Sequence, residues 1–176
     1  WVPPSPRIRT WDTARCYAAT LFTEALPIID NGSGTELVFQ VLGTPLAPRR
    51  GELAKVLRPW NLPGVRLEPI AFTPTAGIHA GSPLHGVRLD IRDPGLFRPA
   101  RTAVAIVERL QKAFGKDALW LDQETSSGFF DQLFGTRSVR ESLQAGESAA
   151  SIAAGWEEDI QQFRVTRNIN ILYGAA

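Results

Sequence analysis

The sequence predicts a single α+β domain in which a small mixed β-sheet is packed by helices, and two segments lead to that prediction. Residues 84–93 (LHGVRLDIRD) alternate apolar and charged side chains from 87 onward, as in a strand with one face in solvent. Residues 100–114 (ARTAVAIVERLQKAF) repeat apolar side chains at helical spacing before Gly115. Because their apolar faces match, we expect an inner or near-inner strand with this helix on the same sheet.

The other elements follow in chain order, without a strict strand–helix–strand rhythm. Pro3, Pro4 and Pro6 favour an extended strap, because each proline fixes its own φ. Thr10 or Asp12 can cap a first helix. Periodicity and turn residues then predict strands at 36–43, 65–72 and 169–173, helices at 51–60, 129–134 and 138–145, and one apolar helical stripe over 151–167.

Composition limits the classes of function. Nineteen basic and eighteen acidic residues leave a formal charge of +1, so no overall field favours nucleic acid or a membrane surface. The single cysteine, Cys16, and two histidines argue against a metal centre. The phosphate-loop and dinucleotide fingerprints are absent, so we expect no cofactor, and no apolar stretch is long enough to span a bilayer.

The stretch DNGSGT, residues 30–35, is the first candidate binding segment. Gly32 and Gly34 can take positive φ and leave backbone amides uncovered, which suits either a tight connection or a polar ligand. Glu24 and Asp30 are the carboxylates nearest these glycines, and a glycosidase needs two such groups. Solvated surface carboxylates are the alternative for both.

His79 and His85 form the second candidate. They lie in a loop rich in glycine, proline and serine that leads into the strand at 84–93. They either face a ligand or hydrogen-bond the loop to itself, and the residues alone leave both alternatives open. Because this loop and residues 32–35 both lead into predicted strands, we expect the two loops to meet at one edge of the sheet.

An ordered series of motifs resembles a known family. WVPPSPRIRTWDTARCY, GSGTELVFQVLGTP, LPGVRLEPIAFTPTAGIHAGSPLHGVRLDI, FDQLFGT with VRESLQAG, and a terminal tryptophan, phenylalanine, arginine and ILY follow one another over the whole chain. Together they are similar to the C-terminal part of the exo-β-N-acetylmuramidase (NamZ, YbbC-like) family.

The resemblance implies a bacterial glycosidase that releases terminal N-acetylmuramic acid from peptidoglycan fragments, in the periplasm or outside the cell. Family members have a Rossmann-like N-terminal domain, a C-terminal α+β domain and a cleft between them. Residues 1–20 would then be the strap and first helix leading from a missing N-terminal domain, and residues 21–176 the C-terminal domain. The family's proposed catalytic glutamate belongs to the missing part, so we expect no hydrolysis by this chain alone.

The resemblance also indicates which candidate residues match the family pattern and which depart from it. The family usually carries an acidic residue, Gly, Arg, Gly and Thr where this chain has Asn31, Gly32, Ser33, Gly34 and Thr35, so the forked arginine donor is replaced by a serine. The histidine segments match the family pattern. The expected substrate-binding residues are therefore Gly32, Ser33, Gly34, Thr35, His79 and His85, with Glu24 and Asp30 as weak catalytic candidates.

Two functions from different classes stay open. The chain is either the substrate-cleft domain of a muramidase, whose partners are a peptidoglycan-derived sugar and its own N-terminal domain, or a divergent non-catalytic domain that serves with a partner protein as a binding or structural subunit of a larger assembly. A Rossmann-like domain encoded upstream in the same gene would favour the first.

Overall fold

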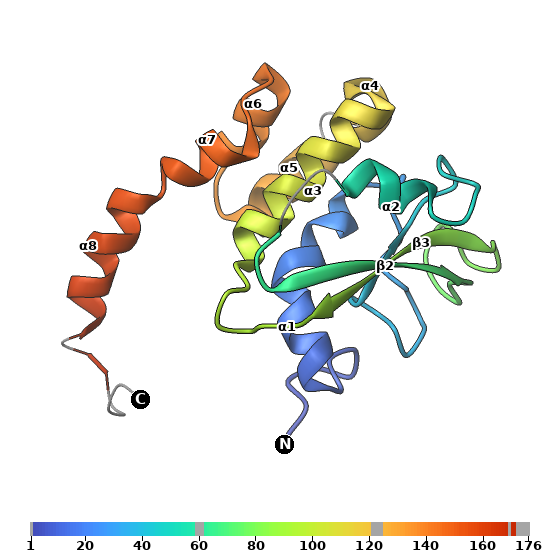
Figure 1. The fold of residues 1–176 in the computed structure, drawn as a ribbon, viewed down its shortest axis with the longest axis horizontal. Helices are drawn as coiled ribbons and strands as arrows, with labels where there is room; N and C mark the ends of the chain where they lie inside the picture. Colours follow the sequence, from blue (N-terminus) through green and yellow to red (C-terminus); the bar gives the residue numbers. More distant parts are fainter. Residues whose placement is uncertain (1, 59–61, 121–124, 169, 172–176) are drawn as a thin grey trace.

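The computed structural model describes residues 2–58, 62–120, 125–168 and 170–171. Helices and a small sheet form one body, which confirms the α+β class (Figure 1). The elements are α1 (Trp11–Thr20), the 3₁₀ helix η1 (Leu21–Ala25), β1 (Val41–Gly43), α2 (Glu52–Leu57), β2 (Val65–Phe72), β3 (Leu84–Ile91), α3 (Pro99–Phe114), α4 (Lys116–Leu119), α5 (Thr125–Phe134), α6 (Ser138–Ala145), α7 (Ala149–Ala154) and α8 (Glu157–Asn168).

The sheet has three strands in the order β1-β3-β2, so the strand predicted at 84–93 is the inner one. Both pairings are antiparallel, with Leu42 opposite Val87 and Leu67 opposite Leu89. Among the described residues the sheet is therefore antiparallel, not mixed as predicted. The reason is local, because β2 and β3 are joined by residues 73–83 as a hairpin and need no crossover helix.

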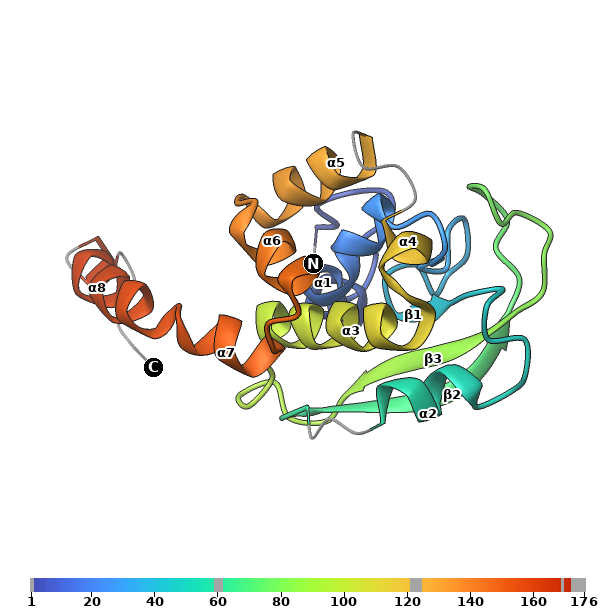
Figure 2. The ribbon, with the colours of Figure 1, turned by 90° about the horizontal axis from the view of Figure 1, so that it is seen from above.

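Helices cover one face of this sheet and enclose the core. Val87 and Leu89 of β3 are buried with Ile106 and Leu110 of α3 in one apolar cluster, which confirms that the helix predicted at 100–114 shares a core with the inner strand. Figure 2 shows α1 and α3 side by side on the same side of the β2–β3 ribbon, and α1 buries Cys16 in this cluster.

Capping residues account for where helices α1 and α3 begin and where α3 ends. The Thr10 hydroxyl caps α1 by accepting a 3.1 Å hydrogen bond from the Thr13 amide, as one of the two predicted caps. Pro99 opens α3, where its missing N–H has no helical partner to lose, and Gly115 ends it. Helix α2 confirms the core of the segment predicted at 51–60, whose residues 59 and 60 lie outside the described residues.

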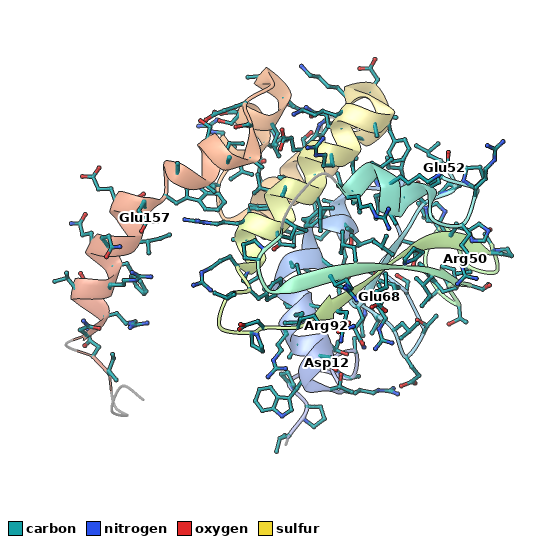
Figure 3. The ribbon with its side chains drawn as sticks, viewed as in Figure 1. Asp12, Arg50, Glu52, Glu68, Arg92 and Glu157 are labelled. Carbon is teal, nitrogen blue, oxygen red and sulfur yellow. The ribbon has the colours of Figure 1, made fainter. Side chains whose placement is uncertain are left out.

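The other face of the sheet is polar. Glu68 and Arg92 lie next to each other on the side turned toward the viewer in Figure 3, and Arg92 Nη2 donates a 3.1 Å hydrogen bond to Glu68 Oε1. Arg92 also pairs with Asp90. The alternation read from the sequence thus separates a buried apolar face from a charged face.

The strand predicted at 36–43 is wrong for its first five residues. Phe39 has a φ of 65°, and its amide donates a 2.7 Å hydrogen bond to the Asn31 carbonyl, so the chain turns back on itself. Only Val41–Gly43 pairs with β3. The consecutive residues Val38 and Phe39 are both buried, which a turn allows and a pleated strand with one buried face does not.

The single stripe predicted over 151–167 is also divided. The chain bends at Gly155, which ends α7, and α8 then projects from the body with no buried residue (Figures 1 and 2). Ile152 is buried as expected, whereas Phe163 is 65% exposed. Of the strand predicted at 169–173, residues 169, 172 and 173 lie outside the described residues, and Asn170 is in a turn.

Candidate functional site

A cleft of about 560 Å³ lies where four segments meet: the strap before α1, the helix η1, the loop before β1 and the connection between β2 and β3. Its volume is in the range of roughly 300–1,000 Å³ that is usual for small-molecule sites. The residues that line it are Arg7, Thr23, Glu24, Leu26, Pro27, Ile29, Asp30, Asn31, Ser33, Gly34, Ala76, Gly77, Ile78 and His79.

Another hollow of about 440 Å³ lies between α3 and α7, and five of its eleven lining residues are alanines. It contains none of the predicted site residues. The 560 Å³ cleft combines two carboxylates, an imidazole, uncovered backbone and apolar walls, so it is the candidate site.

Backbone hydrogen bonds join the two loops predicted to meet. The amides of Thr75 and Ala76 donate to the Ser33 carbonyl at 3.0 and 3.3 Å, and the Thr75 hydroxyl donates to the Gly34 carbonyl at 2.8 Å. The predicted proximity of residues 32–35 and the histidine loop is therefore confirmed. The two loops form one continuous rim of the cleft.

The reason for this proximity differs from the predicted one. Strands β1 and β3 are antiparallel, so the N-terminal end of β1 and the N-terminal end of β3 lie at opposite ends of the pair. Asp30 and Gly43 exchange two backbone hydrogen bonds of 2.9 Å, which places the start of the glycine loop at the end of β1. Gly43 pairs with Gly86 near the start of β3, and this brings the loop to the hairpin connection.

Asp30 holds the loop together. Its side chain is buried, and Oδ1 accepts hydrogen bonds from the Gly32 amide at 2.7 Å and the Ser33 amide at 3.0 Å. Such bonds are typical of an aspartate that fixes a turn. The geometry therefore gives this weak catalytic candidate a structural task.

Gly32 and Thr35 shape the same turn and do not line the cleft. The Thr35 amide and hydroxyl both donate to the Gly32 carbonyl, at 3.0 and 2.7 Å. Gly32 has a φ of 83°, and a β-carbon there would lie 2.8 Å from Val41 Cγ2. Of the predicted glycine-loop residues, only Ser33 and Gly34 reach the cleft.

Glu24 lies in the cleft next to an arginine that the sequence prediction missed. Arg7 Nη1 donates a 2.7 Å hydrogen bond to Glu24 Oε1, and the guanidinium carbon lies 4.6 Å from the centre of the Phe39 ring. Ile8 anchors the strap by packing against Val38 and Phe39. A basic residue within the proline-rich strap was the sequence feature that could have drawn attention to Arg7. Nothing in the sequence placed this residue beside Glu24.

The two histidines lie in different environments. His79 lines the cleft, and its Nε2 lies 2.8 Å from the Pro27 carbonyl oxygen. A carbonyl oxygen only accepts, so Nε2 carries a proton and donates this hydrogen bond. His85 lies within β3 opposite Ala71 and does not line the cleft, and its buried Nδ1 has no hydrogen-bond partner among the described residues.

In the part of the chain that the structure describes, histidine, cysteine, aspartate and glutamate side chains nowhere gather in a group of three that could hold a metal ion. No helix in this part is both long and apolar enough to cross a membrane.

Comparison with known proteins identifies the family of the chain. The model of the family "Exo-beta-N-acetylmuramidase NamZ, C-terminal" matches residues 15–173. The chain belongs to the NamZ C-terminal family. It is 32% identical over 173 residues to the peptidoglycan β-N-acetylmuramidase NamZ of Bacillus subtilis (strain 168), which covers 98% of this chain and 40% of that protein. The resemblance seen in the sequence is thus confirmed, and the relative points to a bacterial origin.

A solved structure shares the fold of this NamZ C-terminal domain. The crystal structure of a DUF1343 family protein from Bacteroides fragilis NCTC 9343 matches with a TM-score of 0.87 at 22% identity, over 99% of this chain and 45% of that one. The chain therefore spans less than half the length of the curated relative and of the solved protein.

Proposed function

We propose that this chain is the substrate-cleft domain of an exo-acting β-N-acetylmuramidase that removes terminal N-acetylmuramic acid from peptidoglycan fragments. The observation that carries the proposal is the 560 Å³ cleft in a chain of the NamZ C-terminal family. Its glycine-backed rim offers polar groups, and Leu26, Ile29 and Ile78 offer apolar walls, as a sugar site requires.

Within this cleft we assign substrate contacts to Ser33, Gly34 and His79. They come from the two joined loops, and the ring of His79 is held by the Pro27 carbonyl. Glycosidases use two carboxyl groups at the scissile bond. We infer that at least one of them comes from a preceding Rossmann-like domain, because Asp30 is engaged by backbone amides and Glu24 by Arg7.

The domain and compartment assignments follow from the same proposal. Residues 1–20 would lead from the preceding domain as a strap and first helix, and residues 21–176 would form the C-terminal domain. Because the substrate is peptidoglycan, the protein would act in the periplasm or outside the cell, in the turnover of cell-wall muropeptides.

The test uses the full-length protein as its gene encodes it, with a chromogenic β-N-acetylmuramide. We expect turnover, and we expect His79→Ala to raise KM about tenfold, as for the loss of one hydrogen bond to substrate. His85→Ala is the matched control and should leave KM nearly unchanged, because that ring does not line the cleft. Absence of turnover by the full-length protein would contradict the proposal.

A non-catalytic binding domain is the second candidate. The engagement of both cleft carboxylates favours it, together with the serine at position 33 where the family usually has an arginine. Under this alternative the full-length protein would bind N-acetylmuramic acid without hydrolysing the chromogenic muramide.

A further inference from the structure

We propose that Arg7 binds a carboxylate of the sugar in this cleft, and thereby selects N-acetylmuramic acid over uncharged N-acetylhexosamines. This rests on the function proposed above. Among the described residues that line the cleft, Arg7 is the one lysine or arginine. N-acetylmuramic acid differs from N-acetylglucosamine by a lactyl ether that ends in a carboxylate, so a fixed cation can distinguish the two sugars.

The guanidinium is oriented before any ligand arrives. Phe39 faces it at 4.6 Å, and Glu24 accepts a 2.7 Å hydrogen bond from Nη1. Ile8 is buried next to Arg7, and the Ile8 amide donates a 3.0 Å hydrogen bond to the Ser5 carbonyl, so the strap that carries Arg7 is itself held in place. A held side chain loses less conformational entropy on binding than a free one.

Donors remain on Arg7 for a second carboxylate. A guanidinium carries five N–H groups, and in the described part of the chain Glu24 is the one hydrogen-bond partner of this one. The Arg7 side chain is 48% exposed, so Nε and Nη2 can reach a ligand. Arginine pairs with carboxylates through two parallel N–H bonds, which adds direction to the attraction.

Charge around Arg7 favours short-range recognition. Glu24 balances the arginine, and Asp30 is a second carboxylate of the cleft whose Oδ1 is engaged by the Gly32 and Ser33 amides, so the cleft has no net cationic field to attract every anion. A ligand carboxylate must therefore reach the free edge of the guanidinium to gain affinity. Leu26 and Ile29 line the same cleft and provide apolar surface for the sugar ring and its methyl groups.

Arg7 also supplies what the glycine loop lacks. Ser33 has no charge, yet Ser33 and Arg7 line the same cleft although they come from different segments. The strap thus brings a forked donor to the rim that is built from Ser33 and Gly34.

Binding of three probes to the full-length protein tests the proposal: N-acetylmuramic acid, its methyl ester and N-acetylglucosamine, each measured by calorimetry. We expect wild type to prefer the acid over the ester and over N-acetylglucosamine by about tenfold or more, the size of a charge-assisted hydrogen bond. Arg7→Gln should abolish this preference while the affinity for N-acetylglucosamine stays the same. Arg7→Lys should keep part of it, because lysine retains the charge without the fork.

Arg9→Gln is the matched control. Arg9 lies on the same strap, pairs with Glu36 and does not line the cleft, so this variant should keep the wild-type preference. If Arg7→Gln keeps the preference for the acid, the proposal for Arg7 is overturned while the sugar cleft stands. If wild type binds none of the three probes, the proposed function itself fails.

Discussion

The hydroxyl of Thr75 donates a 2.8 Å hydrogen bond to the carbonyl oxygen of Gly34, which lies 41 positions earlier in the chain. A β-carbon on Gly34 would lie 2.3 Å from that hydroxyl oxygen and 2.9 Å from the Ala76 nitrogen. Gly34 also has a φ of 76°. The contact that closes the cleft rim thus requires glycine for two reasons, the backbone conformation and the approach of a second loop.

We therefore expect Gly34→Ala to destabilise the protein more than Gly81→Ala does. Gly81 has a φ of 79° but no atom within 4 Å of a β-carbon, so it measures the backbone strain alone, about 1–2 kcal/mol. The clash at Gly34 should add about 1–3 kcal/mol. Urea unfolding of both variants measures the difference, and equal free energies of unfolding would show that the loops do not meet as described.

The sequence predicted that the two loops of the rim meet, but not which charged side chains pair in the cleft. Glycine spacing and a histidine-rich loop are local features, so Gly34 and His79 could be identified from short segments. The pairing of Arg7 with Glu24 depends on how the strap crosses Phe39, which no local pattern contains. The role of Asp30 in holding the turn was not predicted, because its backbone amide partners, at Gly32 and Ser33, are fixed only in the folded turn.

The helices and strands also separate into those that a local sequence pattern predicts and those that it does not. The segments with a clear period, β3 and α3, were predicted because burial of one face dictates their pattern. Residues 36–40 also alternate in the sequence pattern, but the positive φ of Phe39 turns the chain. Residue propensities do not predict a phenylalanine in the left-handed region. The bend at Gly155 was missed because the apolar spacing continues across it.

An ion pair between α5 and α6 should contribute measurably to stability. Arg140 donates from Nε and Nη2 to the two carboxylate oxygens of Asp131, at 2.9 and 2.7 Å, and both side chains are less than one fifth exposed. The hydrogen bonds to Asp131 raise the pKa of Arg140 above its ordinary value. Asp131→Ala should lower the free energy of unfolding by about 1–3 kcal/mol, because a largely buried arginine loses its carboxylate partner and keeps only the hydrogen bond to Gln144.

The exposed pair of Arg101 and Glu157 is the control for that experiment. Its side chains are 49% and 54% exposed, so Glu157→Ala should change the free energy of unfolding by less than about 1 kcal/mol. Thermal or urea unfolding compares the two variants directly. Equal effects would mean that the forked geometry at Arg140 adds nothing.

Cys16 should make the fold sensitive to alkaline pH. Burial raises the pKa of its thiol from 9.0 to about 12, with a smaller contribution from Asp12. The stabilisation is complete below pH 9, where the thiol is neutral in both states. It is lost between about pH 9 and 12, because the unfolded thiol ionises first, by as much as about 1.4 kcal/mol per pH unit.

Unfolding curves between pH 8 and 11 test this slope, and the alkaline loss of stability should be smaller in Cys16→Ala than in wild type. A thiol reagent gives an independent readout, since Cys16 is 1% exposed and should be modified only after unfolding. Rapid modification of the native protein would contradict the buried position of this residue.

The chain alone should not hydrolyse a chromogenic N-acetylmuramide. A glycosidase needs an acid and a second carboxylate at the bond that breaks, and the two carboxylates of this cleft are held by other groups. Glu24 is bonded to Arg7, and Asp30 to the amides of Gly32 and Ser33. Release of the chromophore is measured for the isolated chain and for the full-length protein, with a chromogenic N-acetylglucosaminide as the blank. Turnover by the isolated chain that Glu24→Gln abolishes would place the catalytic acid here, because the variant keeps the shape of the side chain and removes only its charge and acidity.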